Sequence, residues 1–301
     1  MEFEKVYLNE YGFYELKQKP SIEDRKNEFE NEYYQNSMAS YSSKYSEEEL
    51  KMFNIANKRK EMIINEHLQS LGNKKIKDNC SLLDIGCGEE FLLGYFKKKG
   101  WKITGIDFSS YGIEHNNPEL ISDLLQGDCD EILPELIKEN KRYDVINMDS
   151  FLDMSLNPKY VIENCMSLLK EDGLLIVKVA NNYSKLQLHL LEKGKLKKEY
   201  WLDEMGHPYY FGKDGLKKFV ESIGFKMIDL YSESLIDLNL LNDLTNYYEI
   251  SGIGRKCYEA RVEMENLYDS ISPELTLDLL KIYARMGIGR EIVGVFIKNK
   301  F

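Results

Sequence analysis

The segment LLDIGCG, which ends at Gly88, constrains the fold of this chain more than any other part of the sequence. An apolar run at 81–85 holds one acidic residue, Asp84, and Gly86 follows it at once. Glycine readily adopts positive φ, and without a Cβ it lets a ligand approach the backbone. A helix is predicted next, at 91–99, and free N–H groups at a helix start favour a negatively charged group. The pattern therefore predicts a buried strand, a tight turn and a helix that together can hold a charged ligand.

Short apolar runs and amphipathic stretches alternate along the middle of the chain. This alternation predicts an α/β fold in which helical crossovers join parallel strands. The continuous apolar character of the runs is typical of strands that are buried on both faces. We expect further strands at 102–106, 143–148, 174–179, 225–231 and 291–298, and helices at 158–170, 213–223 and 273–286.

The sequence divides into four regions by its texture. Residues 1–75 are polar and tyrosine-rich, and we expect a hairpin and helices that cap the core. Within them, the tyrosine-rich segment 33–45 is expected to be a lid over an active site, or else surface packing. Residues 76–231 form the expected core. Residues 232–290 are mostly helical and predict a cap inserted before a final core strand at 291–301.

The last helix of the insertion has clear end signals. Ser272 is a suitable N-cap, Pro273 suits the first helical position, and Gly287 suits the end. Apolar residues on one stripe of this helix are typical of a side that faces a core. The stripe consists of Leu275, Leu279, Ile282, Tyr283 and Met286.

A second acidic residue, Asp107, ends the next expected strand after Gly88. A carboxylate at this place can accept hydrogen bonds from ribose hydroxyls. Two ligands fit such a site, a dinucleotide or S-adenosylmethionine (SAM). A dinucleotide fingerprint needs a third glycine, but its position holds Phe91. Asp84 would oppose a pyrophosphate beside the turn, whereas its charge suits the ammonium and sulfonium groups of SAM.

With these residues the chain resembles the class I SAM-dependent methyltransferases over about residues 80–230. The run from Asp84 to Gly88 is similar to the first motif of that family. The resemblance implies an α/β fold with a Rossmann-like, seven-stranded, mostly parallel sheet, flanking helices, an antiparallel last strand and additional helical cap elements. It also implies SAM as the cofactor.

The resemblance implies a role for each matching residue. Asp107 would bind the ribose, Asp128 would accept a hydrogen bond from the adenine amine, and Asp149 would lie near the methionine part of SAM or near the acceptor. The residues implied to bind the cofactor are Asp84, Gly86, Cys87, Gly88, Asp107, Phe108, Ser109, Asp128, Cys129 and Asp149.

The chain departs from the family pattern at two places. Glu90 occupies the third glycine position of the first motif, where its charge would oppose the carboxylate of SAM unless the side chain turns to solvent. Met154 stands where the family often has a histidine. A base is therefore missing there, and we expect His207, in a loop after the fifth strand, to be catalytic together with Asp149.

Composition and apolar patterning indicate which partners, metals and location to expect for this chain. The net charge of −11 opposes a nucleic-acid partner, because phosphate binding needs a basic face. The five cysteines have no zinc or disulfide spacing, and we expect no metal. No stretch of 18 apolar residues predicts a membrane span, and the N-terminal sequence does not resemble a secretion signal, so we expect a cytoplasmic protein.

The expected acceptor is a small polar molecule that is methylated on oxygen. The layout resembles methyltransferases of bacterial surface-polysaccharide clusters, which implies a sugar or a sugar-linked intermediate. Three alternatives remain open: an N-methyltransferase of a small amine, a non-catalytic SAM-binding partner subunit, and a nucleotide-dependent oxidoreductase. Glu90 and Met154 motivate the non-catalytic alternative. The sequence does not indicate an oligomeric state.

Overall fold

The computed structural model describes residues 3–21, 45–70 and 79–299. Residues 22–44 and 71–75 of the expected N-terminal cap, which include all of the tyrosine-rich segment except Tyr45, lie outside these residues. The described strands are β1 (Val6–Leu8), β2 (Tyr14–Leu16), β3 (Ser81–Ile85), β4 (Lys102–Asp107), β5 (Leu124–Gln126), β6 (Tyr143–Asp149), β7 (Leu169–Ala180), β8 (Tyr209–Tyr210), β9 (Phe225–Glu233) and β10 (Glu291–Lys298). The described helices are α2 (Glu47–Ser70), α3 (Phe91–Lys97), α4 (Tyr111–Asn116), η2 (Pro118–Asp123), α5 (Cys129–Lys138), α6 (Pro158–Leu168), α7 (Lys185–Glu192), α8 (Lys213–Ser222), η3 (Ile236–Leu241), α9 (Gly254–Ile271) and α10 (Pro273–Met286).

Seven strands form the main sheet, in the order β5-β4-β3-β6-β7-β10-β9. The first five strands are parallel to one another, whereas β10 is antiparallel to both β7 and β9. The predicted fold class is therefore confirmed. The chain runs outward from β3 to β5 and then returns to β6 on the other side of β3. Open α/β sheets bind ligands at the carboxyl ends of the strands where the strand order reverses, which here are β3 and β6.

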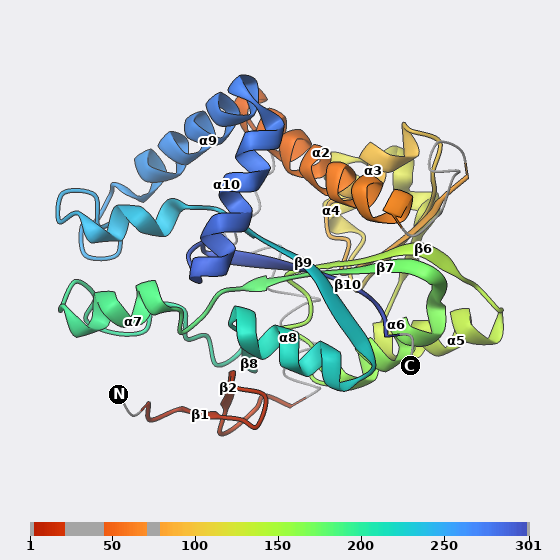
Figure 1. Cartoon of the computed structure of the whole chain (residues 1–301), viewed down its shortest axis with the longest axis horizontal. Coiled ribbons are helices and arrows are strands. Elements are labelled where there is room, and N and C mark those ends of the chain that lie inside the picture. The colour runs from red at the N-terminus through yellow and green to blue at the C-terminus, as the bar shows by residue number, and fades with distance from the viewer. Residues whose placement is uncertain (1–2, 22–44, 71–78, 300–301) are drawn as a thin grey trace.

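Helices cover both faces of the sheet (Figure 1). Helices α2, α3, α4, α9 and α10 lie above it in this view, and α5, α6 and α8 lie below it. Each layer buries an apolar cluster: Ile63, Phe96 and Val293 belong to the upper one, and Leu133 and Phe219 belong to the lower one. The sheet is thus buried on both faces, as the continuous apolar runs predict.

A second, three-stranded sheet joins the start of the chain to the region before α8. The expected N-terminal hairpin forms from β1 and β2, and β2 also pairs with β8. Phe13, between the two hairpin strands, packs against Phe211 with 4.3 Å between the ring centroids. The hairpin is therefore packed into the lower core.

Two expectations about local structure were wrong. Strand β7 begins at Leu169 rather than at residue 174, because Leu169 pairs with Tyr143 and Lys170 Nζ lies 2.7 Å from Asp144 Oδ2. Most of the stripe of α10 does not face the core either: Leu275 and Met286 are 66% and 54% exposed, whereas Tyr283 packs against the upper apolar cluster. Helix α10 instead buries the other face against β9 and α9, with the residues Thr276, Leu277, Leu280 and Ala284.

The end signals of α10 are confirmed. The Ser272 hydroxyl accepts a hydrogen bond from Leu275 N at 3.2 Å, and Gly287 ends the helix with φ +76°. Helices η3, α9 and α10 all lie in the chain between β9 and β10. None of the helices in the described ranges is long and apolar enough to cross a membrane.

Candidate cofactor site

The glycine turn after β3 is held by backbone hydrogen bonds to β4. Gly86 N and Cys87 N both donate to Ile106 O, at 2.8 and 3.1 Å, and Gly88 N donates to Asp107 Oδ2 at 2.9 Å. Gly86 has φ +73°, and a Cβ there would lie 2.7 Å from the Phe151 ring. A Cβ on Gly88 would meet no described atom within 4 Å. The turn is therefore closed at its first glycine and open at its second.

Asp84 is buried in β3 below this turn. Its Oδ1 accepts a hydrogen bond from Asn147 Nδ2 at 2.6 Å. Burial, with added repulsion from Asp149, raises the pKa of Asp84 to about 7. A cation placed beside this carboxylate would stabilise its ionised form, which is what the ammonium group of an amino-acid ligand supplies.

Asp107 ends β4 with its carboxylate fixed by the backbone. In addition to Gly88 N, its Oδ1 accepts from Ser109 N at 3.0 Å, and burial raises its pKa. Ser109 Oγ accepts from Tyr111 N at 3.1 Å, which starts α4, and Phe108 O accepts from Gln126 Nε2 at 3.1 Å. These hydrogen bonds hold the loop after β4 beside the glycine turn.

Asp128 and Cys129 lie at the start of α5, beyond β5. Asp128 Oδ1 caps the helix by accepting from Asp130 N at 2.9 Å. Cys129 is buried among apolar side chains, and burial raises the pKa of its thiol well above the ordinary range. Capping is a structural role for Asp128, so its predicted contact with adenine would have to be made in addition to it.

Asp149, at the end of β6, is paired with two lysines. Lys60 Nζ lies 2.5 Å from both of its carboxylate oxygens, and Lys178 Nζ lies 3.3 Å from Oδ2. These two cations outweigh burial and lower the pKa of Asp149. The carboxylate is therefore ionised at any ordinary pH, which makes it an orienting group rather than a strong proton acceptor.

The sequence reasoning missed Lys60 and Lys178. Lys60 reaches down from α2, is buried, and also donates to Asn147 Oδ1 at 2.9 Å, so that it connects Asp149 to the partner of Asp84. Lys178 is joined to Glu233 at 3.3 Å on its other side. A lysine inside the apolar run LLIVKVA was a signal for Lys178. Lys60 had no such signal, because it lies in a helix rich in charged residues.

Glu90 points into the protein and not to solvent. It has φ +58° and is 1% exposed, and its Oε1 lies 3.6 Å from Cys87 Sγ. Its carboxyl fills space that a side chain at position 105 would need, since a Cβ on Gly105 would lie 2.6 Å from Oε1. Burial raises the pKa of Glu90 to about 7. The repulsion expected between Glu90 and a bound carboxylate is therefore reduced.

Glu89 directly follows Gly88, the last glycine of the turn. Its carboxylate accepts from Tyr45 Oη at 2.9 Å and from Asn116 Nδ2 at 2.8 Å. The end of the tyrosine-rich segment is thus attached next to Gly88. Burial raises the pKa of Glu89 to about 7.

His207 lies in the loop before β8, in a different group of residues from Asp149. Its Nδ1 is 3.5 Å from Asp203 Oδ2, and its imidazole lowers the pKa of Asp203 to about 2. The imidazole is partly exposed. The two residues predicted to be catalytic therefore have separate partners, and the histidine has a carboxylate of its own.

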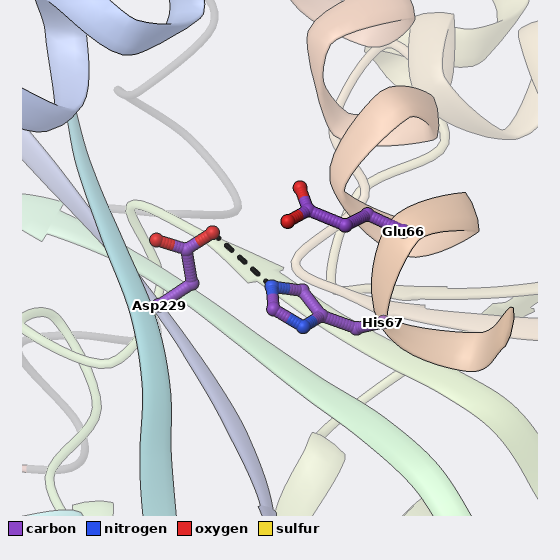
Figure 2. Close-up of side chains that lie close together, drawn as sticks. All are labelled: Glu66, His67 and Asp229. Atoms are coloured by element: carbon purple, nitrogen blue, oxygen red, sulfur yellow. Dashed lines mark hydrogen bonds and ion pairs between the residues drawn. The ribbon is translucent and has the colours of Figure 1, made fainter. Parts of the chain in front are cut away.

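A separate group of possible metal ligands lies between α2 and β9 (Figure 2). His67 Nε2 lies 3.1 Å from Asp229 Oδ2, with Glu66 beside them. Lys281 Nζ is 2.6 Å from Asp229 and 3.6 Å from Glu66. A lysine thus already supplies the positive charge that these carboxylates attract, and the group connects α2, β9 and α10.

Comparisons with known proteins identify the family of this chain. A family model described as a methyltransferase domain matches residues 55–230. The chain is 27% identical over 156 residues to a ubiquinone biosynthesis O-methyltransferase of Glaesserella parasuis serovar 5, a match that covers 48% of this chain and 61% of that protein. It is 28% identical over 156 residues to a ubiquinone biosynthesis O-methyltransferase of Coxiella burnetii, covering 50% of this chain and 64% of the relative. The chain thus spans less than two thirds of the length of either curated relative.

Among solved structures, the chain is similar to the plantazolicin methyltransferase BamL in complex with a triazolic desmethylPZN analog and SAH. That similarity has a TM-score of 0.50 at 16% identity and covers 83% of this chain and 86% of the other. It supports the fold. The family model covers more than half of the chain and contains the turn from Asp84 to Gly88, together with Asp107 and Asp149. The chain therefore belongs to the methyltransferase-domain family.

Proposed function

We propose that this chain binds SAM at the glycine turn and transfers its methyl group to an oxygen atom of a small polar acceptor. The observation that carries the proposal is the position of Asp84 and Asp107 on either side of a turn that is open at Gly88. Carboxylates suit both the ammonium group and the ribose hydroxyls of SAM. The backbone at Gly88 lets a ligand approach without steric conflict.

Each site residue has a proposed role toward the cofactor. Asp84 attracts the ammonium group, Asp107 accepts hydrogen bonds from the ribose, and Asp128 accepts one from the adenine amine. Gly86, Cys87, Phe108, Ser109 and Cys129 contribute to the same proposed site through their backbone or by packing. Asp149, held between Lys60 and Lys178, fixes the end of β6 where the methyl group and the acceptor would meet.

SAM, when bound, supplies a methyl group on a positively charged sulfur that leaves as a neutral thioether. The acceptor oxygen forms the new bond to the methyl carbon while the carbon–sulfur bond breaks, and the hydroxyl proton must be removed. We propose that His207 accepts this proton. The Asp203 carboxylate beside it stabilises the protonated ring. Holding the two reactants in line supplies most of the remaining rate.

Oxygen is the acceptor atom that the relatives favour, because both curated relatives are named O-methyltransferases. We propose a sugar or a sugar-linked intermediate as the acceptor, since the net charge of −11 opposes a nucleic acid. A second candidate is an acceptor of ubiquinone biosynthesis, which the names of those relatives suggest.

A panel of acceptors with isotopically labelled SAM tests the reaction. The panel holds nucleotide sugars, phosphosugars, quinone precursors, small amines and peptides. We expect label in a hydroxyl-bearing acceptor, and transfer to amines or peptides alone would contradict the proposal. SAM binding without transfer to any acceptor would favour a non-catalytic subunit.

The His207→Ala variant tests the proposed base. Its kcat should fall about a hundredfold or more, while SAM affinity stays unchanged. His115→Ala is the matched control, because His115 is an exposed histidine on α4 whose Nδ1 contacts Tyr111 O at 2.8 Å. Full activity in His207→Ala would remove His207 from the mechanism.

A further inference from the structure

The outer face of α10 carries an apolar stripe that nothing in the described part of the chain covers. Leu275, Ile282 and Met286 are 66%, 46% and 54% exposed, and Leu279 between them is partly exposed. In Figure 1, α10 lies at the front of the molecule, over the β9 edge of the sheet, with no other element on its outer side. Three large apolar side chains exposed on one helix are more than scattered surface residues, and such faces mark interaction sites.

The spacing of the stripe is that of a coiled-coil seam. Leu275, Leu279, Ile282 and Met286 follow one another at intervals of four, three and four residues. This pattern is symmetric about the point between Leu279 and Ile282. Two copies of α10 packed antiparallel around a twofold axis there would place Leu275 of one copy beside Met286 of the other, and Leu279 beside Ile282.

Two unpaired charges flank the stripe with complementary signs. Asp278 and Arg285 are both exposed, lie on the same side of the seam, and make no hydrogen bond or ion pair with any residue in the described ranges. They are seven residues apart, about 10 Å along the helix, which is too far for them to pair with each other. In the antiparallel arrangement, Asp278 of each copy lies next to Arg285 of the other. The same axis therefore satisfies both the apolar stripe and the charges.

We propose that this chain forms a homodimer through antiparallel pairing of α10. The occupant of the stripe is a second copy of the same chain, since α10 complements itself in the spacing of its apolar residues and in its charges. The proposal is independent of the cofactor site, because α10 lies on β9 and α9 rather than at the ends of β3 and β4. It assigns a role to the apolar residues that the core of the chain leaves out.

Sedimentation velocity of the full chain, from about 1 to about 100 μM, tests the dimer. We expect a dimer whose dissociation constant rises at least about tenfold in Asp278→Arg and in Arg285→Asp, because each places like charges opposite each other. The double variant D278R/R285D should restore the wild-type dissociation constant, because the exchanged charges pair again. Ile282→Glu should give a monomer.

Glu192→Arg is the matched control, since Glu192 is an exposed acid on α7 with no partner in the described ranges. It should leave the dimer unchanged. Circular dichroism establishes that each variant is folded. A monomeric wild type across the whole concentration range would overturn the proposal. A dimer that tolerates Ile282→Glu, or whose weakening in the single variants is not reversed in the double variant, would do the same.

Discussion

Glu90 combines a left-handed backbone with a buried carboxyl group. Its φ is +58°, a value that costs a side-chain-bearing residue on the order of 1 kcal/mol, and its Oε2 has no hydrogen-bond partner among the described atoms. Other family members are expected to have glycine here, which removes both costs. A residue that both its backbone conformation and its burial disfavour therefore stands within the proposed cofactor site, and functional sites often contain such residues.

The contribution of the Glu90 carboxyl group to stability can be measured by its dependence on pH. Its pKa is about 7 in the folded chain against an ordinary 4.5, so the folded state binds more protons between these values. Stability contributed by this group is therefore present below pH 4.5 and is lost as pH rises toward 7. We predict that Glu90→Gln is increasingly stabilised relative to the wild type from pH 5 to pH 7.5, measured by urea unfolding. A constant difference across this range would contradict the buried orientation.

A buried lysine on α2 connects the upper helical layer to the ends of the strands. Lys60→Met leaves Asp149 with one cation instead of two, so we predict a loss of about 3 kcal/mol in the free energy of unfolding. Lys58→Met on the same helix is the control, because Lys58 is 41% exposed and lies 3.4 Å from Asp269. That change should cost less than about 1 kcal/mol. Equal losses of unfolding free energy in the two variants would show that the buried pair of Lys60 and Asp149 stabilises the fold no more than an exposed pair does.

Among the elements, the glycine turn can be tested with two glycine-to-alanine variants, which separate the cost of backbone strain from the loss of ligand access. Gly88→Ala adds a Cβ in open space at φ +55°, and Gly100→Ala adds one in open space at φ +83°, in the turn after α3. Both should lose about 1 kcal/mol of stability. Only Gly88→Ala should also weaken SAM binding, by about tenfold or more, because its Cβ lies where the ligand must approach. Calorimetric titration with SAM checks this, and unchanged affinity in Gly88→Ala would place the ligand elsewhere.

Local sequence patterns predicted the type of most elements, but not which side of α10 is buried or where β7 begins. The strands at β3, β4, β6 and β10 follow from apolar runs whose lengths suit buried strands. The stripe on α10 was assigned to the core because periodicity shows that a helix has an apolar side, not which side it packs. Here Thr276 and Ala284 face inward with two leucines, so the buried face is the less apolar one by sequence. The early start of β7 depends on the pairing of Leu169 with Tyr143, which cannot be predicted from the sequence of β7 alone.

At the scale of the whole molecule, the order of the strands determines where the site lies. Asp84, Asp107 and Asp149 are far apart in the sequence but end neighbouring parallel strands, so the sheet brings them to one edge. Sequence reasoning predicted this edge because each acid directly follows an apolar run. It did not predict Lys60 and Lys178 as the partners of Asp149, or Glu233 as the second partner of Lys178, because these pairs depend on how α2, β7 and β9 pack. The fold and the cofactor motif were therefore predictable, whereas the charges that support them were not.

Isothermal titration calorimetry with SAM, on the wild type and on isosteric variants of two acids, tests whether SAM binds at the glycine turn. Asp84→Asn and Asp107→Asn keep the side-chain shape and remove the charge, whereas Asp214→Asn removes an exposed charge that pairs with neighbouring Lys213. We predict binding to the wild type and to Asp214→Asn with equal affinity, and a loss of about tenfold or more in each of the other two variants. Equal SAM affinity in all four proteins, or binding of a nicotinamide dinucleotide without binding of SAM, would contradict the account.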